Sequence, residues 1–482
     1  MNTSLKVVVL EAGDRFGGRF LTCMMPGGFA ADLGAMRILP LSHKLLSQLI
    51  NEMNLGIEKF YKAEDSAKNT FTGYFRNHKV KDLNDLKRIY DVHEQDMPYF
   101  VPANSGIDIK VPENGNVFEG TIGNTELLAK DVSQACYLSL SNNAEVLSKG
   151  DCHYSLSITM ADLASFLQQY EHADKTHPLV GYHCIKGGFE SLIARLLAKL
   201  NQMPQVTLLK NSMVVGVDED KIGFYLSTEH GKPRSIIGKS MVLACNARGI
   251  ELISWNGPHF RNTQFQRLFS NLEKVIAVKV YLTYQTAWWE DYGLFSGSIE
   301  TDLPIKEITA FGQRGKSNEF ATLLAAFTYL DVGIFEGLNQ ASYPRFKPVV
   351  GDVPQELLPS QVLVDYVQRQ LQAVFGVKEM MNPVCAITKI WMSDPIAAAN
   401  YNSRVGVNTY ELQWKALKPF PDAPIYIAGD SFVPSIKSVG AFIGWSEGSL
   451  LNSERILVNH FGLKPYATGI PMANEFLTTA KL

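Results

Sequence analysis

A short apolar run that leads into an acid and a glycine-rich turn is the feature that most constrains this sequence. Residues Lys6-Val-Val-Val-Leu-Glu11 continue directly into a turn that extends from Gly13 to Arg19. A continuous apolar run of this length is typical of a strand buried on both faces of a parallel sheet. In nucleotide-binding βαβ units the second strand ends in an acid that binds the ribose hydroxyls, and Glu11 is placed for that role. The segment therefore predicts an α/β fold with a nucleotide site near its start.

The remaining patterns predict more than one lobe. A chain of 482 residues exceeds one ordinary hydrophobic core. One helix is predicted after Ser42 as its N-cap, and an amphipathic helix is predicted from Ser360 to Gly376. Strands are predicted at residues 6–11, 206–209, 213–217, 240–244, 274–284, 320–329 and 425–428.

Signals of a dinucleotide-binding domain lie at the start, the middle and the end of the chain. We predict one discontinuous Rossmann-like domain from residues 1–58, 180–256 and 413–465. Residues 59–179 are polar and weakly periodic, which favours a helical insertion. Residues 257–412 are expected to form a mixed-sheet substrate-binding domain.

Composition excludes several classes of protein. The net charge of −3 gives no electrostatic attraction to nucleic acid or to an anionic membrane surface. No apolar run approaches the roughly 20 residues of a membrane span, and the run Val7 to Leu10 is too short for a signal-peptide core. The six cysteines are scattered without a CxxC pair, and the histidines show no metal-ligand spacing. We expect a cytoplasmic protein without a metal site.

A second segment, Leu33-Gly-Ala-Met-Arg37, follows the glycine-rich turn at the distance that is found in one protein family. The two segments together resemble flavin-containing amine oxidases, and the Gly-x-Met-Arg form is similar to L-amino-acid oxidases and amino-acid 2-monooxygenases. The resemblance implies that Arg37 binds the substrate carboxylate, which suits a planar guanidinium. Taken alone, the tetrapeptide also fits an arginine in a surface ion pair. The FAD-binding residues implied in these two segments are Glu11, Ala12, Arg15, Gly17, Gly18, Arg19, Gly34, Ala35, Met36 and Arg37.

The C-terminal part carries a third signal. The segment Ile425-Tyr-Ile-Ala-Gly-Asp430, followed by Gly444-Trp445-Ser-Glu-Gly448, resembles the closing strand and last helix of the same family. By that resemblance Gly429 and Asp430 contact the flavin ribityl chain and phosphate. Gly444 and Trp445 would also contact the flavin. The Gly444 carbonyl would bind the substrate amino group, and Trp445, a candidate catalytic residue, would line the pocket.

Lys279 is the fourth signal, because it interrupts an apolar strand pattern. A lysine is costly to bury unless it has a task, and in the family a lysine at this place holds a water against flavin N5. A solvated strand face is the alternative interpretation. Phe327, Tyr329 and Trp445 are expected to line the substrate pocket, and Val214 lies where the family's backbone contact to adenine is expected.

The resemblance implies FAD-dependent oxidation of an L-amino acid by O2, which yields a 2-oxo acid, ammonia and hydrogen peroxide. No cysteine lies near the closing Gly-Asp segment in sequence, so noncovalent FAD is expected. A 2-monooxygenase of the same fold and a non-catalytic scaffold are the alternatives. Substrate specificity stays open, and a homodimer is the default expectation.

The dinucleotide fold normally begins with a strand, a Gly-x-Gly-x-x-Gly turn and a helix. This sequence reaches what resembles the second strand by Lys6. We therefore expect the first βα unit to be missing, which would leave a gap or an exposed apolar edge in the sheet. A start codon placed downstream, a partner chain that supplies the unit and a degenerate protein are the three explanations.

Overall fold

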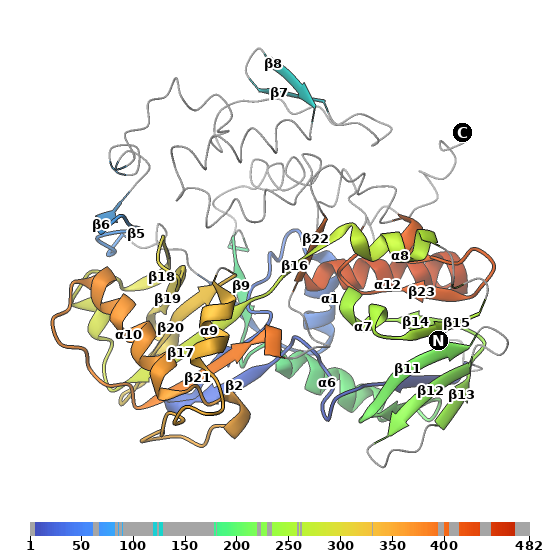
Figure 1. The fold of residues 1–482 in the computed structure, drawn as a ribbon, viewed down its shortest axis with the longest axis horizontal. Helices are drawn as coiled ribbons and strands as arrows, with labels where there is room; N and C mark the ends of the chain where they lie inside the picture. The colour runs from blue at the N-terminus through green and yellow to red at the C-terminus, as the bar shows by residue number, and fades with distance from the viewer. Residues whose placement is uncertain are drawn as a thin grey trace.

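The chain forms a mixed α/β structure with two sheet-based lobes and helices α1 and α6 between them (Figure 1). These helices span Lys44–Glu52 and Glu190–Leu200. The computed structural model describes residues 5–60, 67–81, 85, 89, 119–122, 125–128, 178–179, 181–218, 223–228, 234–257, 260, 263–329, 331–393, 400–403, 414–433 and 445–467.

One lobe is built on a seven-stranded mixed sheet in the order β21-β17-β20-β19-β18-β5-β6, counted over the described strands. Adjacent strands are antiparallel except for β18 and β5, which are parallel. Every residue of β17 and β20 is buried, which agrees with the strands predicted at 274–284 and 320–329. The strands are β5 (Gly73–Phe75), β6 (His78–Val80), β17 (Val278–Tyr284), β18 (Ser296–Thr301), β19 (Glu307–Phe311), β20 (Ala321–Thr328) and β21 (Cys385–Ile390).

Strands β5 and β6 lie within the segment for which the sequence favoured a helical insertion. Each has three residues, too few for a strand period to stand out among polar neighbours. Because β5 pairs with β18, this hairpin extends the large sheet. The rest of the expected insertion lies largely outside the described residues.

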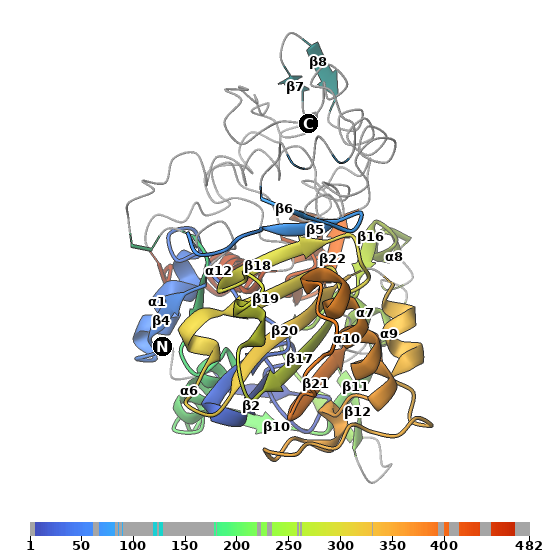
Figure 2. The same ribbon diagram turned by 90° about the vertical axis from the view of Figure 1, so that its left-hand side faces the viewer.

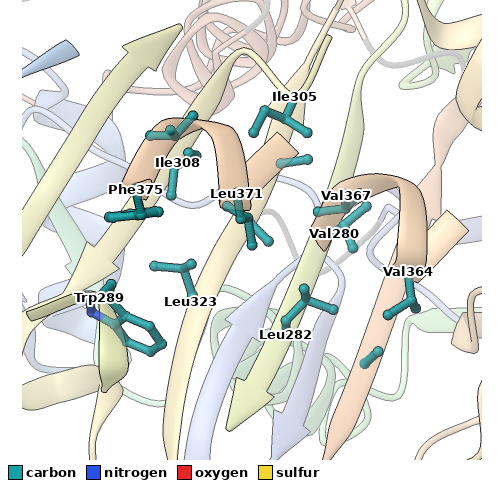
Figure 3. Close-up of a cluster of buried hydrophobic side chains, with 14 of the residues drawn as sticks. Val280, Leu282, Trp289, Ile305, Ile308, Leu323, Val364, Val367, Leu371 and Phe375 are labelled. Atoms are coloured by element: carbon teal, nitrogen blue, oxygen red, sulfur yellow. The ribbon is translucent and has the colours of Figure 1, made fainter. Parts of the chain in front are cut away.

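Helices α9 (Val332–Leu338) and α10 (Gln361–Phe375) cover one face of this sheet (Figure 2). The apolar stripe of α10 packs on sheet residues such as Leu323 and forms with them the largest buried cluster of the described residues (Figure 3). Ser360 accepts a hydrogen bond from the Leu363 amide at 3.0 Å, and Gly376 ends the helix with a φ of 74°. The helix predicted after Ser360 and its predicted end at Gly376 are confirmed.

The other lobe contains two parallel strand pairs and a four-stranded sheet among the described residues. Strand β1 pairs with β10, and β14 pairs with β23. The four-stranded sheet has the order β13-β12-β11-β15. The strands are β1 (Val7–Leu10), β10 (Val206–Leu209), β11 (Ser212–Asp218), β12 (Gly223–Thr228), β13 (Arg234–Ile237), β14 (Met241–Leu243), β15 (Ser254–Asn256) and β23 (Ile425–Ile427). The helices here are α7 (Ala247–Glu251), α8 (Thr263–Ser270) and α12 (Ser446–Phe461).

Strand β1 differs from its prediction in burial. Val7 and Val8 are 46% and 44% exposed, and β10 is the only described strand that pairs with β1. The expected burial on both faces is therefore wrong for the described residues. An apolar run predicts a strand, but its burial depends on the neighbours that the fold supplies.

Short hairpins and bridging strands complete the described structure. Strands β2 (Thr22–Met25) and β3 (Phe29–Asp32) form a hairpin directly before the Leu33–Arg37 segment. The remaining described pairs are β4 (Ile57–Lys59) with β9 (His183–Ile185), β7 (Glu119–Ile122) with β8 (Thr125–Leu128), and β16 (Leu272–Val275) with β22 (Asn400–Ser403). Within the described part of the chain, no helix combines the length and the apolar character needed to cross a lipid bilayer.

Candidate active site

A cavity of about 2660 Å³ is lined by residues from both lobes. The segments that follow three parallel strands reach it, through Glu11 after β1, Cys245 after β14 and Asp430 after β23. Ligands of open α/β sheets bind outside the carboxyl ends of the strands. Sites for a single small ligand measure about 300–1000 Å³, so this cavity has room for an extended cofactor and a substrate together.

Nearly all of the site residues predicted from the sequence line this cavity. Gly444 lies outside the described residues and is not placed. The predicted residues that line the cavity are Glu11, Ala12, Arg15, Gly17, Gly18, Arg19, Gly34, Ala35, Met36, Arg37, Val214, Lys279, Phe327, Tyr329, Gly429, Asp430 and Trp445.

The turn after β1 is held by its own polar groups. Glu11 accepts a hydrogen bond from the Gly13 amide at 2.7 Å, and Arg15 donates to the Phe20 carbonyl at 2.9 Å. Gly17 has a φ of 113°, which a residue with a Cβ rarely adopts. The turn thus has a defined shape within the cavity wall.

Arg19 and Asp430 join this turn to the end of β23 through an ion pair. Asp430 is buried, whereas Arg19 is partly exposed to the cavity. Two residues that are 411 positions apart are therefore held in contact at the cavity wall. The sequence predicted each residue separately as a cofactor contact but did not predict that they pair.

Gly34 allows two backbone segments to approach closely. A Cβ on Gly34 would lie 1.6 Å from the Arg19 carbonyl oxygen, which no side chain could tolerate. The Ala35 amide donates to that same Arg19 carbonyl at 3.1 Å. The Leu33–Arg37 segment therefore lies directly against the glycine-rich turn.

Lys279 is buried beside the same segment. Its ammonium donates to the carbonyls of Asp32 and Gly34 at 2.9 and 2.6 Å, and the side chain is 2% exposed. The alternative of a solvated strand face is excluded by this burial. Burial lowers the pKa of Lys279 to about 7, although the Asp32 carboxylate acts in the opposite direction.

Asp32 is a buried acid that the sequence interpretation missed. Its carboxylate accepts hydrogen bonds from the Thr22 hydroxyl at 2.6 Å and from the Phe189 amide at 2.9 Å. Burial raises the pKa of Asp32 to about 6 against these hydrogen bonds and the charge of Lys279. An acid at the end of the apolar run Phe29-Ala-Ala was the available signal in the sequence.

Arg37 lies at the cavity wall in an ion pair with Glu307, whose carboxylate is 3.6 Å from Nη2. Both side chains are largely buried, at 19% and 9% exposure. The ion pair that the tetrapeptide alone allowed is thus present, but it is not a surface pair. Glu307 was missed because it lies in β19, far away in sequence from Arg37. Phe327 and Tyr329 also line the cavity, and their ring centroids lie 4.9 Å apart.

Trp445 is the N-cap residue of α12 and lines the cavity. Its ring is parallel to the Tyr182 ring at 6.2 Å and meets the His43 ring edge-on at 5.0 Å. Two residues later, the buried Glu447 accepts hydrogen bonds from the Leu45 and Leu46 amides at 2.9 and 2.8 Å. These contacts fix the start of α12 against the start of α1.

Cys245 lies beside the closing Gly-Asp segment in space although not in sequence. A Cβ on Gly429 would lie 2.3 Å from the Cys245 carbonyl oxygen. Burial raises the pKa of the Cys245 thiol to about 11, which disfavours the reactive thiolate.

Val214, the expected adenine contact, also lines the cavity from β11. The described residues contain no group of three or more His, Cys, Asp or Glu placed to hold a metal ion.

Comparison with known proteins identifies the family. A family profile described as "Flavin containing amine oxidoreductase" matches residues 2–435. The chain belongs to this family. An L-amino-acid oxidase of Mus musculus is 25% identical over 354 residues, which cover 69% of this chain and 52% of that protein. Aplysianin-A of Aplysia kurodai is 20% identical over 495 residues, covering 94% of this chain and 86% of that protein.

The solved structures of the family share the fold. A putrescine oxidase variant redesigned in its cofactor binding superposes with a TM-score of 0.62 at 15% identity, covering 95% of this chain and 94% of that one. The chain spans only about half to three fifths of the length of the L-amino-acid oxidases that it matches, including that of Vipera ammodytes ammodytes at 23% identity. The expected fold class and the family resemblance are confirmed.

Replacement of Asp32 by Ala is predicted to destabilise this family member by about 3–5 kcal/mol, because the buried Lys279 loses its counter-charge and the Phe189 amide loses its acceptor. Asp32→Asn keeps an acceptor oxygen and should cost clearly less. Equilibrium urea unfolding of the three proteins measures both differences. Equal losses for Ala and Asn would contradict the assigned role of the acceptor.

Lys279 also gives a pH dependence of stability. Its folded pKa of about 7 lies below the value of about 10.4 expected for the unfolded chain. The unfolded state therefore binds one more proton between these pH values, and the free energy of unfolding should rise with pH across this window, by at most about 1.4 kcal/mol per pH unit. Lys279→Met should remove this rise, as measured by urea unfolding at pH 7, 8 and 9. A slope that is identical in both proteins would exclude the assignment.

Proposed function

We propose that the protein oxidises the α-carbon of an L-amino acid with noncovalent FAD as its cofactor. One observation carries the proposal: Arg37 and Lys279 line the same cavity as the segments that follow three parallel strands. A guanidinium binds a carboxylate, and the ends of parallel strands bind a dinucleotide. The similarity to L-amino-acid oxidases supports the same activity.

The described residues fit FAD. Glu11 would bind the ribose hydroxyls, and Arg19 would donate to the pyrophosphate. Asp430 would contact the ribityl chain, with Val214 beside the adenine. The high pKa of the Cys245 thiol supports noncovalent binding. FAD held there would supply the oxidising chemistry, with O2 as the final electron acceptor and hydrogen peroxide as its product.

The protein's own residues prepare the substrate. Arg37 binds and orients the α-carboxylate, so that the α-carbon has a fixed position in the cavity. Oxidation requires the neutral α-amine. Lys279, which lines the cavity, would hold a water for this reaction. The aromatic wall of Phe327, Tyr329 and Trp445 excludes bulk water from this position. After release, the imino acid hydrolyses to a 2-oxo acid and ammonia.

A cytoplasmic location and a homodimer belong to the same proposal. The described cysteines Cys23, Cys184, Cys245 and Cys385 are all free thiols, which supports a reducing compartment. Cell fractionation tests the location. Light scattering of the purified protein tests the dimer.

The first experiment is the visible absorption spectrum of the protein after incubation with FAD and gel filtration. The proposal expects flavin bands that stay with the protein and disappear after denaturation. In Arg19→Ala the bands should be weaker, because the ion pair with Asp430 and the pyrophosphate donor are both lost. A wild-type protein that elutes without flavin would contradict the cofactor assignment.

Arg37→Ala should raise the KM for L-amino acids about 10- to 100-fold and change kcat less, since hydrogen bonds to a charged group contribute about 1.5–3 kcal/mol. Peroxide-coupled kinetics with a panel of L-amino acids measures both constants. Arg314→Ala is the matched control, because Arg314 contacts Glu58 and is not among the described residues that line the cavity. If the KM of Arg37→Ala equalled that of the control, the carboxylate assignment would be wrong.

A further inference from the structure

Arg37 is surrounded by more aromatic and charged side chains than the binding of a carboxylate requires. Its guanidinium carbon lies 5.5 Å from the Phe60 ring centroid, 5.2 Å from that of Tyr182 and 5.7 Å from that of Phe327. Glu307 completes this enclosure with its carboxylate 3.6 Å from Nη2. Three aromatic faces and one anion therefore already stabilise the positive charge before any ligand arrives.

Glu307 is held as an anion inside the protein. Thr309 donates to its carboxylate at 3.1 Å, and Ser298 donates to Thr309 or accepts from it at 2.7 Å. Burial raises the pKa of Glu307, but Arg37, Ser298, Lys306 and Thr309 together outweigh burial and hold the pKa below its usual value. The negative charge of Glu307 is thus a permanent feature of the site at neutral pH.

Arg37 lies between Glu307 and the cavity. Among the described residues, Arg37 lines the cavity whereas Glu307 does not. A ligand carboxylate in the cavity therefore meets a guanidinium whose other side is already opposed by a carboxylate. The distance of 3.6 Å between Arg37 Nη2 and the Glu307 carboxylate exceeds the roughly 2.7–2.9 Å of a tight charge-assisted hydrogen bond.

We propose that Glu307 is the specificity-determining residue of this pocket: it shares Arg37 with the ligand and sets how strongly the pocket prefers ligands that carry a carboxylate. The inference rests on the proposed function, in which Arg37 binds the substrate carboxylate. Glu307 opposes a second anion by charge repulsion through a poorly screened interior. It also attracts a ligand cation, so the ratio of the two affinities depends on its charge.

Binding of benzoate and benzylamine, measured by titration calorimetry without turnover, tests this role. Glu307→Gln should bind benzoate about 5- to 50-fold more tightly than wild type and benzylamine more weakly. Glu356→Gln is the matched control, because Glu356 also lines the cavity, is exposed and is not an observed partner of Arg37. It should change neither affinity by more than about twofold.

A second variant separates charge from folding. Glu307→Asp keeps the anion, so its benzoate-to-benzylamine affinity ratio should stay within about threefold of wild type. Thermal unfolding checks that all variants are folded. Weaker benzoate binding in folded Glu307→Gln would overturn the proposal, because Glu307 would then act only by positioning Arg37. Equal ratios in the Gln variant and wild type, or no benzoate binding by wild type, would also overturn it.

The two proposals can fail separately. If wild type oxidises L-amino acids and Glu307→Gln leaves the affinity ratio unchanged, the specificity role fails while the activity stands. If the ratio changes as expected but no L-amino acid is oxidised, the activity fails while the specificity role stands.

Discussion

The contacts of Asp32 hold together three parts of the structure that lie far apart in the sequence. Its carboxylate binds the Thr22 hydroxyl and the Phe189 amide, which fixes the β2–β3 hairpin to the start of α6. Its backbone carbonyl accepts hydrogen bonds from Lys279 and from the Tyr281 hydroxyl, both on β17. One residue therefore joins the β2–β3 hairpin, helix α6 and the seven-stranded sheet. Because it is buried, the Phe189 amide and the Tyr281 hydroxyl would each lose this acceptor if Asp32 moved.

The buried charges near Asp32 compensate one another. The charges of Asp32, Arg37 and Glu307 all shift the pKa of Lys279, and the charge of Lys279 in turn shifts the pKa of Asp32. Two acids and two bases are thus placed together where charge interactions are poorly screened by water. An isolated charge in such a place would be costly, whereas alternating charges lower that cost. The protonation state of Lys279 is therefore a property of the group and not of one side chain.

Local sequence patterns predicted the elements and the cavity-lining residues well. The end of α10 at Gly376, the strand around Lys279 and the glycine-rich turn all depend on neighbours within a few residues. Such short-range rules are readable in a single sequence. The enclosure of Lys279 also followed from local reasoning, because an ammonium within an apolar strand requires partners.

The partners themselves were beyond the reach of local patterns. Ser42 was predicted to cap the first helix, yet α1 begins at Lys44, and its amides are bound by Glu447, about 400 residues away in sequence. Glu307 and Asp32 were missed for the same reason, since a buried acid shows its role only when the residue that it binds is known. The exposure of Val7 and Val8 likewise depends on which strands lie beside β1.

The Leu33–Arg37 segment determines how Arg19, proposed to bind the cofactor, and Arg37, proposed to bind the substrate, are placed relative to one another. On one side Gly34 lies against the Arg19 carbonyl, at a distance that only glycine allows. On the other side its own carbonyl accepts a hydrogen bond from Lys279, and the Leu33 carbonyl accepts one from the Trp391 indole at 3.1 Å. Arg37 follows three residues later. Its position relative to Arg19 is therefore set by backbone contacts, and this rigidity is what orientation of a substrate against a cofactor requires.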